Sequence, residues 1–163
     1  MSPRASLQAS PPQLGEVLEY LRLIWALDHA LQKASRRMKS ALGVTGPQRL
    51  VIRIVCRFPG IAAGGVAELL HVHPSTLTGI LKRLERKGLV SRRSDPRDRR
   101  RAFLGVTEKG KRIDAAEAGT VEAAAREVIA RTPRRRMEGA RRILIDLAGS
   151  LGEASAPGRD VRP

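Results

Sequence analysis

The chain of 163 residues has few of the residue types that mark several common classes of protein. Its one cysteine, Cys56, rules out an internal disulfide framework and a zinc site built from several cysteines. No apolar run approaches the roughly 20 residues that a membrane-spanning helix needs. Residues 1–13 contain no apolar stretch like that of a secretory signal. We therefore expect a soluble cytoplasmic protein with no membrane partner.

Aromatic residues are scarce too, with only Tyr20, Trp25, Phe58 and Phe103 in the whole chain. Proteins that bind single-stranded nucleic acids or read RNA usually stack bases on aromatic side chains. Of the four, only Phe103 adjoins the most basic stretch of the sequence, and strand alternation predicts that its side chain faces inward. A single-strand or RNA binder is therefore disfavoured.

The chain has a large excess of positive charge, with 31 Lys and Arg against 16 Asp and Glu and a formal net charge of +15. Residues 82–101 hold ten basic and three acidic side chains, nearly half of that excess. Charge runs are usually only solvated surface, but this one adjoins a helix and a hairpin of recognisable form. The charge points to a polyanionic partner, most simply duplex DNA, which is bound largely through its phosphates.

The spacing of the apolar residues predicts a mainly helical chain. Thr45 and Pro47 mark one helix start, as an N-cap and a residue that the first turn tolerates. The first helix is so long that one flank could pack on another subunit, although it could also be a simple core helix. The predicted helices are 14–41, 48–57, 64–70, 74–87, 108–131 and 133–151.

The helices at 64–70 and 74–87 are joined by a tight turn, and the second begins with small polar residues. This arrangement is typical of a helix-turn-helix. His73 takes the N-cap position of the second helix. His71 and His73 alone are too weak a signal for zinc, so we expect no metal site.

Two short strands follow the helix-turn-helix, at 89–93 and 101–106, and the residues between them favour a turn. Arginines surround this turn. A hairpin with arginines at its tip has little reason to exist for packing, so the pattern predicts a wing.

Residues 75–110 carry four short motifs in a specific order and spacing. They are Ser75-Thr76-x-Thr78, Leu84-Glu85-x-x-Gly88-Leu89-Val90-x-Arg92, Asp95-x-x-Asp98-Arg99-Arg100 and Thr107-x-x-Gly110. This segment resembles the MarR family of bacterial transcriptional regulators. A looser match, in lengths and apolar pattern, extends over residues 14–151.

The resemblance implies a mainly α fold with a small β-hairpin wing, in which a winged helix-turn-helix lobe is joined to a helical dimerisation domain. We expect the lobe at 44–106, the dimerisation region at 13–43 and 107–151, and disordered segments at 1–12 and 152–163. The family also implies a homodimer on a near-palindromic operator. The second helix of the motif would enter the major groove, and the wing tip would reach the adjacent minor groove.

The helix at 74–87 presents small polar and basic side chains that suit DNA. Lys82 and Arg83 suit phosphates, although Arg83 could instead brace the helix against the wing. Gly79 costs about 1 kcal/mol relative to Ala in a helix, which indicates either close approach to DNA or tolerance at a solvated position. Arg97 and Arg99 are candidates for the minor groove, because narrow grooves attract arginine. The expected DNA-binding residues are Ser75, Thr76, Thr78, Gly79, Lys82, Arg83, Arg97 and Arg99.

Two acids lie in the predicted wing, Asp95 and Asp98. Unpaired, they would repel phosphate. We therefore expect them to brace the wing by pairing with its arginines, with ordinary turn chemistry as the alternative.

The sequence predicts a sequence-specific, duplex-DNA-binding transcriptional regulator, a homodimeric repressor that a small-molecule effector releases. The resemblance puts the effector between the two lobes, near Trp25, His29 and Arg53. One alternative is a constitutive or architectural DNA-binding protein with no effector, and a weaker one is a winged-helix module for protein contact. The chain has no hydrolase, nucleotide-loop or metalloprotease motif, so we expect neither an enzyme nor a cofactor.

Cys56 lies in the apolar helix at 48–57 and is expected to be a small buried hydrophobe. A redox sensor needs an exposed thiol with a lowered pKa. The neighbouring Arg53 and Arg57 keep that second interpretation open.

Overall fold

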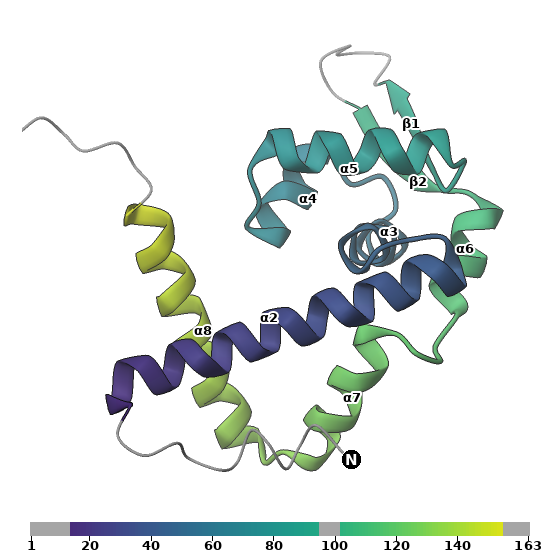
Figure 1. Cartoon of the computed structure of the whole chain (residues 1–163). Helices are drawn as coiled ribbons and strands as arrows, with labels where there is room; N and C mark the ends of the chain where they lie inside the picture. The colour runs from purple at the N-terminus through teal and green to yellow at the C-terminus, as the bar shows by residue number, and fades with distance from the viewer. Residues whose placement is uncertain (1–13, 95–101, 155–163) are drawn as a thin grey trace, which may run out of the picture. The chain divides into compact units, whose positions relative to one another are not determined.

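The computed structural model describes residues 14–94 and 102–154. Most of them are helical, and the two strands form one antiparallel hairpin, as predicted (Figure 1). None of the helices in this described part combines the length and hydrophobicity needed to cross a membrane. The elements are α2 (Gly15–Leu42), α3 (Gly46–Arg57), α4 (Ala63–Leu70), α5 (Pro74–Arg86), β1 (Val90–Ser94), β2 (Ala102–Val106), α6 (Glu108–Ala115), α7 (Val121–Arg131) and α8 (Arg134–Ala154).

The chain divides into two compact units, residues 1–121 and 122–163. The first contains α2 to α6 with the hairpin, and the second contains α8 and nearly all of α7. The finer division into arm, lobe, dimerisation region and tail stays a prediction.

One hydrophobic core holds the first unit together. Within this unit, α3 lies between α2 on one side and α4, α5 and the hairpin on the other (Figure 1). Burial of a large aliphatic side chain contributes roughly 1.5–3 kcal/mol, so this core fixes α5 firmly. The apolar side chains with no exposed surface include Val44, Val51, Ile52, Val66, Leu81 and Leu84.

The start of α3 confirms the predicted cap. The backbone N–H of Gln48 donates to Thr45 Oγ1, and the backbone N–H of Thr45 donates to Gln48 Oε1 at 3.2 Å. This reciprocal pair satisfies N–H groups that the first turn of a helix leaves without partners. Just before it, Gly43 ends α2 with φ of +73°, a conformation that glycine adopts without strain.

The prediction of one helix from 108 to 131 is wrong. α6 ends at Ala115, and residues 116–120 separate it from α7. Gly119 has φ of +71°, outside the helical region. Thr120 is buried within this break, where its hydroxyl donates to the Glu117 carbonyl at 2.8 Å.

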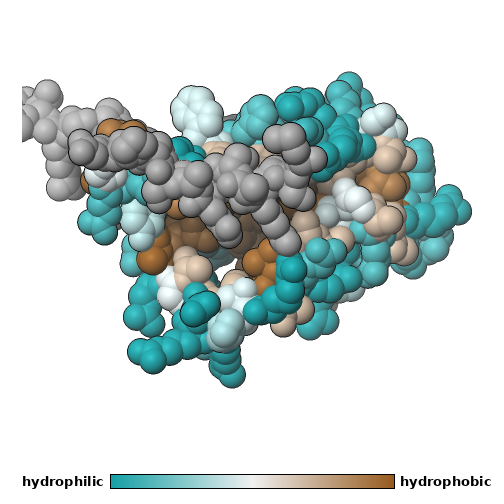
Figure 2. All heavy atoms as spheres, turned by 60° about the horizontal axis from the view of Figure 1, so that its bottom comes forward, coloured by the Kyte–Doolittle hydropathy of each residue, from teal (hydrophilic) through white to brown (hydrophobic). Residues whose placement is uncertain are grey.

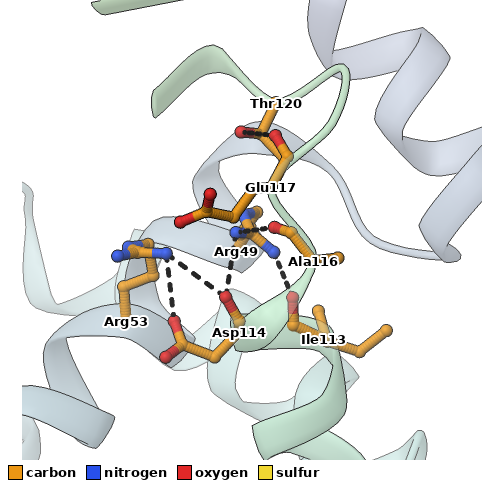
Figure 3. A network of polar contacts seen from close by, with 7 residues as sticks. All are labelled: Arg49, Arg53, Ile113, Asp114, Ala116, Glu117 and Thr120. Atoms are coloured by element: carbon orange, nitrogen blue, oxygen red, sulfur yellow. Dashed lines mark hydrogen bonds and ion pairs between the residues drawn. The ribbon is translucent and has the colours of Figure 1, made fainter. Parts of the chain in front are cut away.

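A buried arginine of α3, far away in sequence, holds the backbone at the break. Arg49 has no exposed surface, and its guanidinium donates to the carbonyls of Ile113, Asp114 and Ala116, the second at 3.1 Å (Figure 3). The last carbonyls of a helix lack partners within the helix. Arg49 supplies them, so the chain can end α6 and turn inside the fold.

The hairpin corrects a second expectation. β1 pairs with β2 so that Val90 faces Val106 and Ser94 faces Ala102. Phe103, expected to face inward, is 40% exposed, whereas Leu104 is 1% exposed. Alternation holds, but its phase is shifted by one residue. Leu104 is fixed because its N–H donates to the Ile61 carbonyl and its carbonyl accepts from the Gly60 N–H, both at 3.0 Å.

Candidate nucleic-acid interface

The turn between α4 and α5 is built by two histidines. His71 ends α4 with φ of +50°, and its N–H donates to the Glu68 carbonyl at 3.1 Å. His73 is the N-cap of α5, as predicted, because its Nδ1 accepts from the Ser75 N–H at 3.3 Å. Pro74 then occupies the first helical position, where a missing N–H has no cost.

α5 has one buried side and one open side. Leu77, Leu81 and Leu84 are at most 1% exposed and anchor the helix to the core. Their spacing of four and three residues makes one stripe along the helix. The predicted DNA-binding residues of α5 lie outside this stripe. Ser75, Thr76, Thr78, Lys82 and Arg83 are exposed, and Gly79 is half-buried.

The hydroxyl groups at the start of α5 differ in whether they are already hydrogen-bonded. Ser75 Oγ lies 2.7 Å from His73 Nδ1, and the Thr78 hydroxyl donates to the Pro74 carbonyl at 2.8 Å. The Thr76 hydroxyl makes no hydrogen bond to any residue that the structure describes. Thr76 is therefore the hydroxyl best placed to contact an outside partner.

Packing does not explain the glycine on this helix. A Cβ at Gly79 would meet no heavy atom within 4 Å. The surroundings therefore leave room for a larger side chain, and the choice between close approach to DNA and simple tolerance stays open.

The wing is braced by an ion pair that the sequence reasoning missed. Arg92 Nε of β1 lies 2.9 Å from Glu85 Oε1 of α5. This pair ties the helix to the hairpin. The predicted tip residues Arg97, Arg99, Asp95 and Asp98 lie outside the described residues.

The motif Thr107-x-x-Gly110 has a clear structural role. The Thr107 hydroxyl donates to the Gly88 carbonyl at 2.7 Å and accepts from the Gly110 N–H at 3.1 Å. A Cβ at Gly110 would collide with the carbonyl oxygen of Leu89 and with Val106. These contacts join the start of α6 to the end of α5 and hold the base of the hairpin.

The three residues expected at an effector site lie on two helices, α2 and α3. Trp25 is 79% exposed and His29 is also exposed, both on α2. Arg53 instead pairs with Asp114, with Nη1 3.4 Å from Oδ1 (Figure 3). Within the described part of the chain, no hydrogen bond or ion pair joins Arg53 to Trp25 or His29. The effector site stays a prediction.

Cys56 is half-buried beside the same network. Burial raises the pKa of its thiol, and the negative charge of Asp114 raises it further, while Arg53 and Lys111 act in the opposite direction. A raised pKa keeps the group as an unreactive thiol. The environment therefore favours the structural interpretation over the redox sensor. In the described part of the chain, no group of three His, Cys, Asp or Glu side chains is arranged to hold a metal.

Comparison with known proteins shows which family the winged part of the chain is similar to. Residues 42–101, which span the end of α2, the helix-turn-helix and part of the hairpin, match the model of the MarR family. Over this segment the chain is similar to the MarR family. It is 36% identical over 85 residues to the transcriptional regulator HosA of Escherichia coli O111:H-, a match that covers 52% of this chain and 63% of HosA. The chain thus spans less than two thirds of this relative's length.

Solved structures of MarR-type regulators confirm the winged helix-turn-helix fold. The transcriptional regulator SlyA superposes with a TM-score of 0.68 at 25% identity, over 83% of this chain and 96% of that one. MepR of S. aureus, solved as a complex with DNA, gives the same TM-score at 20% identity, over 80% and 97%. The fold predicted from the MarR-like motifs is therefore correct.

Proposed function

We propose that this chain is a MarR-family transcriptional regulator that is sequence-specific and binds duplex DNA as a homodimer. The observation that carries the proposal is the construction of α5. Its buried leucines fix the helix, while its small polar and basic side remains open beside a braced hairpin. HosA and SlyA are named as transcriptional regulators, and the MepR neighbour was solved with DNA, which supports the same role here.

On this proposal α5 lies in the major groove, whose width of about 12 Å admits a helix. Ser75, Thr76 and Thr78 then face base edges or phosphates at its start, and Lys82 and Arg83 hold phosphates further along. We assign Arg97 and Arg99 to the adjacent minor groove. If each subunit neutralises about four phosphates, log K falls with log salt at a slope of about −7.

The exposed apolar side chains of α2 and α8 support a homodimer. α2 exposes large apolar side chains, among them Val17 at 71% and Trp25 at 79%, and in α8 Leu151 is 63% exposed. On the face drawn in Figure 2, apolar side chains are open to view between polar ones. Apolar surface of this extent is typical of an interaction site. A second copy is the partner that a palindromic operator requires.

Regulation follows from the dimer. We infer that the protein represses transcription and that a small molecule near Trp25, His29 and Arg53 releases it from DNA. Such a ligand acts by stabilising a spacing of the two DNA-binding lobes that no longer matches the operator.

The test is to sequence the DNA fragments that the purified protein retains at moderate salt. We expect a near-palindromic motif with half-sites about one helical turn, roughly 34 Å, apart. The double substitution Arg97→Ala and Arg99→Ala should weaken binding to that motif. A strictly monomeric protein, or equal affinity for the motif and random duplex, would contradict the proposal, and equal affinity would favour an architectural role.

A further inference from the structure

A second basic surface lies at the end of α5 opposite to Ser75 and Thr76. Arg86 is eleven residues beyond Ser75, which separates the two by roughly 16 Å along the helix axis. Here the ends of α2 and α5 and the start of α3 surround an open hollow, which we call the basic hollow. It is lined by Lys39, Thr45, Gln48, Arg83, Arg86 and Lys87.

The charges around the basic hollow are of one sign. Its lining includes four cations and no acid. Within the described part of the chain, none of the four forms an ion pair. Like charges gathered around one space repel one another, and an anion placed among them relieves that repulsion.

The side-chain amide of Gln48, at the basic hollow, has one donor that no described residue occupies. Gln48 is only 6% exposed. Its Oε1 accepts from the Thr45 N–H at 3.2 Å and from Lys87 Nζ at 3.3 Å. Because both neighbours are donors, the orientation of the amide is fixed. Its Nε2 is thereby left without a hydrogen bond to any described residue.

The remaining donors have separate tasks. Lys87 also donates to the Gly43 carbonyl, so it holds the loop between α2 and α3. The Gly46 N–H donates to Ser35 Oγ at 2.9 Å, and the Gln48 N–H is taken by Thr45. The backbone at the start of α3 is therefore occupied. The donors available to a ligand are the side chains of Lys39, Arg83, Arg86 and the Gln48 amide.

We propose that the basic hollow binds an oxyanion of the phosphate type. Its arginines present planar forks of donors that match phosphate oxygens, and Gln48 Nε2 adds a neutral donor that no described residue occupies. The phosphate belongs either to the DNA backbone beyond the groove or to a free small molecule. The binding of free phosphate does not depend on the proposed function.

The experiment is a titration of the full chain with inorganic phosphate, followed by NMR at the Gln48 side-chain amide and the arginine Nε–H groups. Two variants test the site. The double substitution Lys39→Gln and Arg86→Gln removes surface charge only. Gln48→Glu keeps the acceptor for Thr45 and Lys87 but replaces the free donor by a negative charge. Arg112→Gln, on exposed α6 surface, is the matched control.

We expect a saturable shift at Gln48 in the wild type and in the control. Both hollow variants should bind phosphate at least about tenfold more weakly, because each loses at least one donor to the anion and becomes less positive. If Gln48→Glu disturbs α3, the Lys39→Gln, Arg86→Gln variant still tests whether the basic hollow binds phosphate. Shifts that do not saturate, or that persist equally in the variants, would overturn the proposal.

The salt dependence of duplex binding separates the two sources. If the hollow holds a backbone phosphate, the Lys39→Gln, Arg86→Gln variant should show a slope smaller by about 2. If it holds a free anion, the slope stays the same while phosphate binding is lost. A chain that binds phosphate but no duplex would overturn only the proposed function. A chain that binds duplex while phosphate never reaches the hollow would overturn only this inference.

Discussion

The core formed by α3 to α5 buries its apolar side chains, whereas the helices α2 and α8 expose many of theirs. In the core, Ile52, Leu81 and Leu84 are completely buried within one subunit. Along α8, Ile143, Leu144 and Ile145 are each more than half exposed. The core thus has its partners inside its own compact unit, whereas many apolar side chains of α2 and α8 are exposed. On the proposed function, the first group sets stability and the second sets assembly.

The largest effect on the free energy of unfolding should follow from Arg49→Met, which removes a buried charged side chain. Three carbonyls at the end of α6 would lose a charged donor inside the fold, at a cost of about 4 kcal/mol. Urea unfolding measures it. Arg57→Met, an exposed site on the same helix, should change stability by less than about 0.5 kcal/mol. Equal effects at the two sites would show that Arg49 does not hold the α6–α7 turn.

Trp25→Ala should act on assembly rather than on the fold. A large aromatic side chain at the centre of an interface typically contributes about 2–4 kcal/mol to association. We expect a matching rise in the dimer dissociation constant, measured by sedimentation equilibrium. Phe58→Ala, which removes an exposed aromatic directly after α3, should leave association unchanged. If both substitutions have the same effect, α2 is not the dimer surface.

Two glycine substitutions compare a tightly packed position, Gly110, with an open one, Gly79. Gly110→Ala forces a methyl group against the Leu89 carbonyl and should cost about 2 kcal/mol of folding free energy. Gly79→Ala meets open space and should stabilise the helix by about 0.5–1 kcal/mol. Thermal unfolding of the two variants gives the sign directly. Destabilisation at Gly79 would mean that α5 packs differently.

The smallest effect concerns Cys56. Because burial and Asp114 raise the pKa of its thiol, less thiolate is present at neutral pH than in a free cysteine. Alkylation should therefore be slower than that of a free thiol and should accelerate only at higher pH. Asp114→Asn should lower the pKa and speed the reaction. Fast alkylation of the wild type at pH 7 would revive the sensor interpretation.

Local signals in the sequence predicted most of the fold. The caps at Thr45 and His73 and the leucine stripe of α5 depend on residues a few positions apart, so spacing alone reveals them. The wrong phase at Phe103 has a different origin. In so short a strand two phases of alternation are both acceptable, and the backbone of Ile61 decides between them.

Arg49 was missed for a related reason. An arginine among apolar residues on a helix usually extends its head group to solvent, so it carries no warning of burial. Its partners are carbonyls 64 or more residues away in sequence. Those carbonyls lack a partner within the helix only because α6 stops there. The break and the arginine explain each other, and neither is visible without the fold.

The most direct test of the central claim, that the open side of α5 binds duplex DNA, is fluorescence anisotropy with a duplex selected from the retained fragments. The double substitution Thr76→Ala and Lys82→Ala should weaken binding at least about tenfold and reduce the salt slope by about 2, because the dimer loses one phosphate contact in each subunit. The Arg112→Gln control should bind like the wild type. Unchanged affinity and slope in the α5 variant would contradict the account.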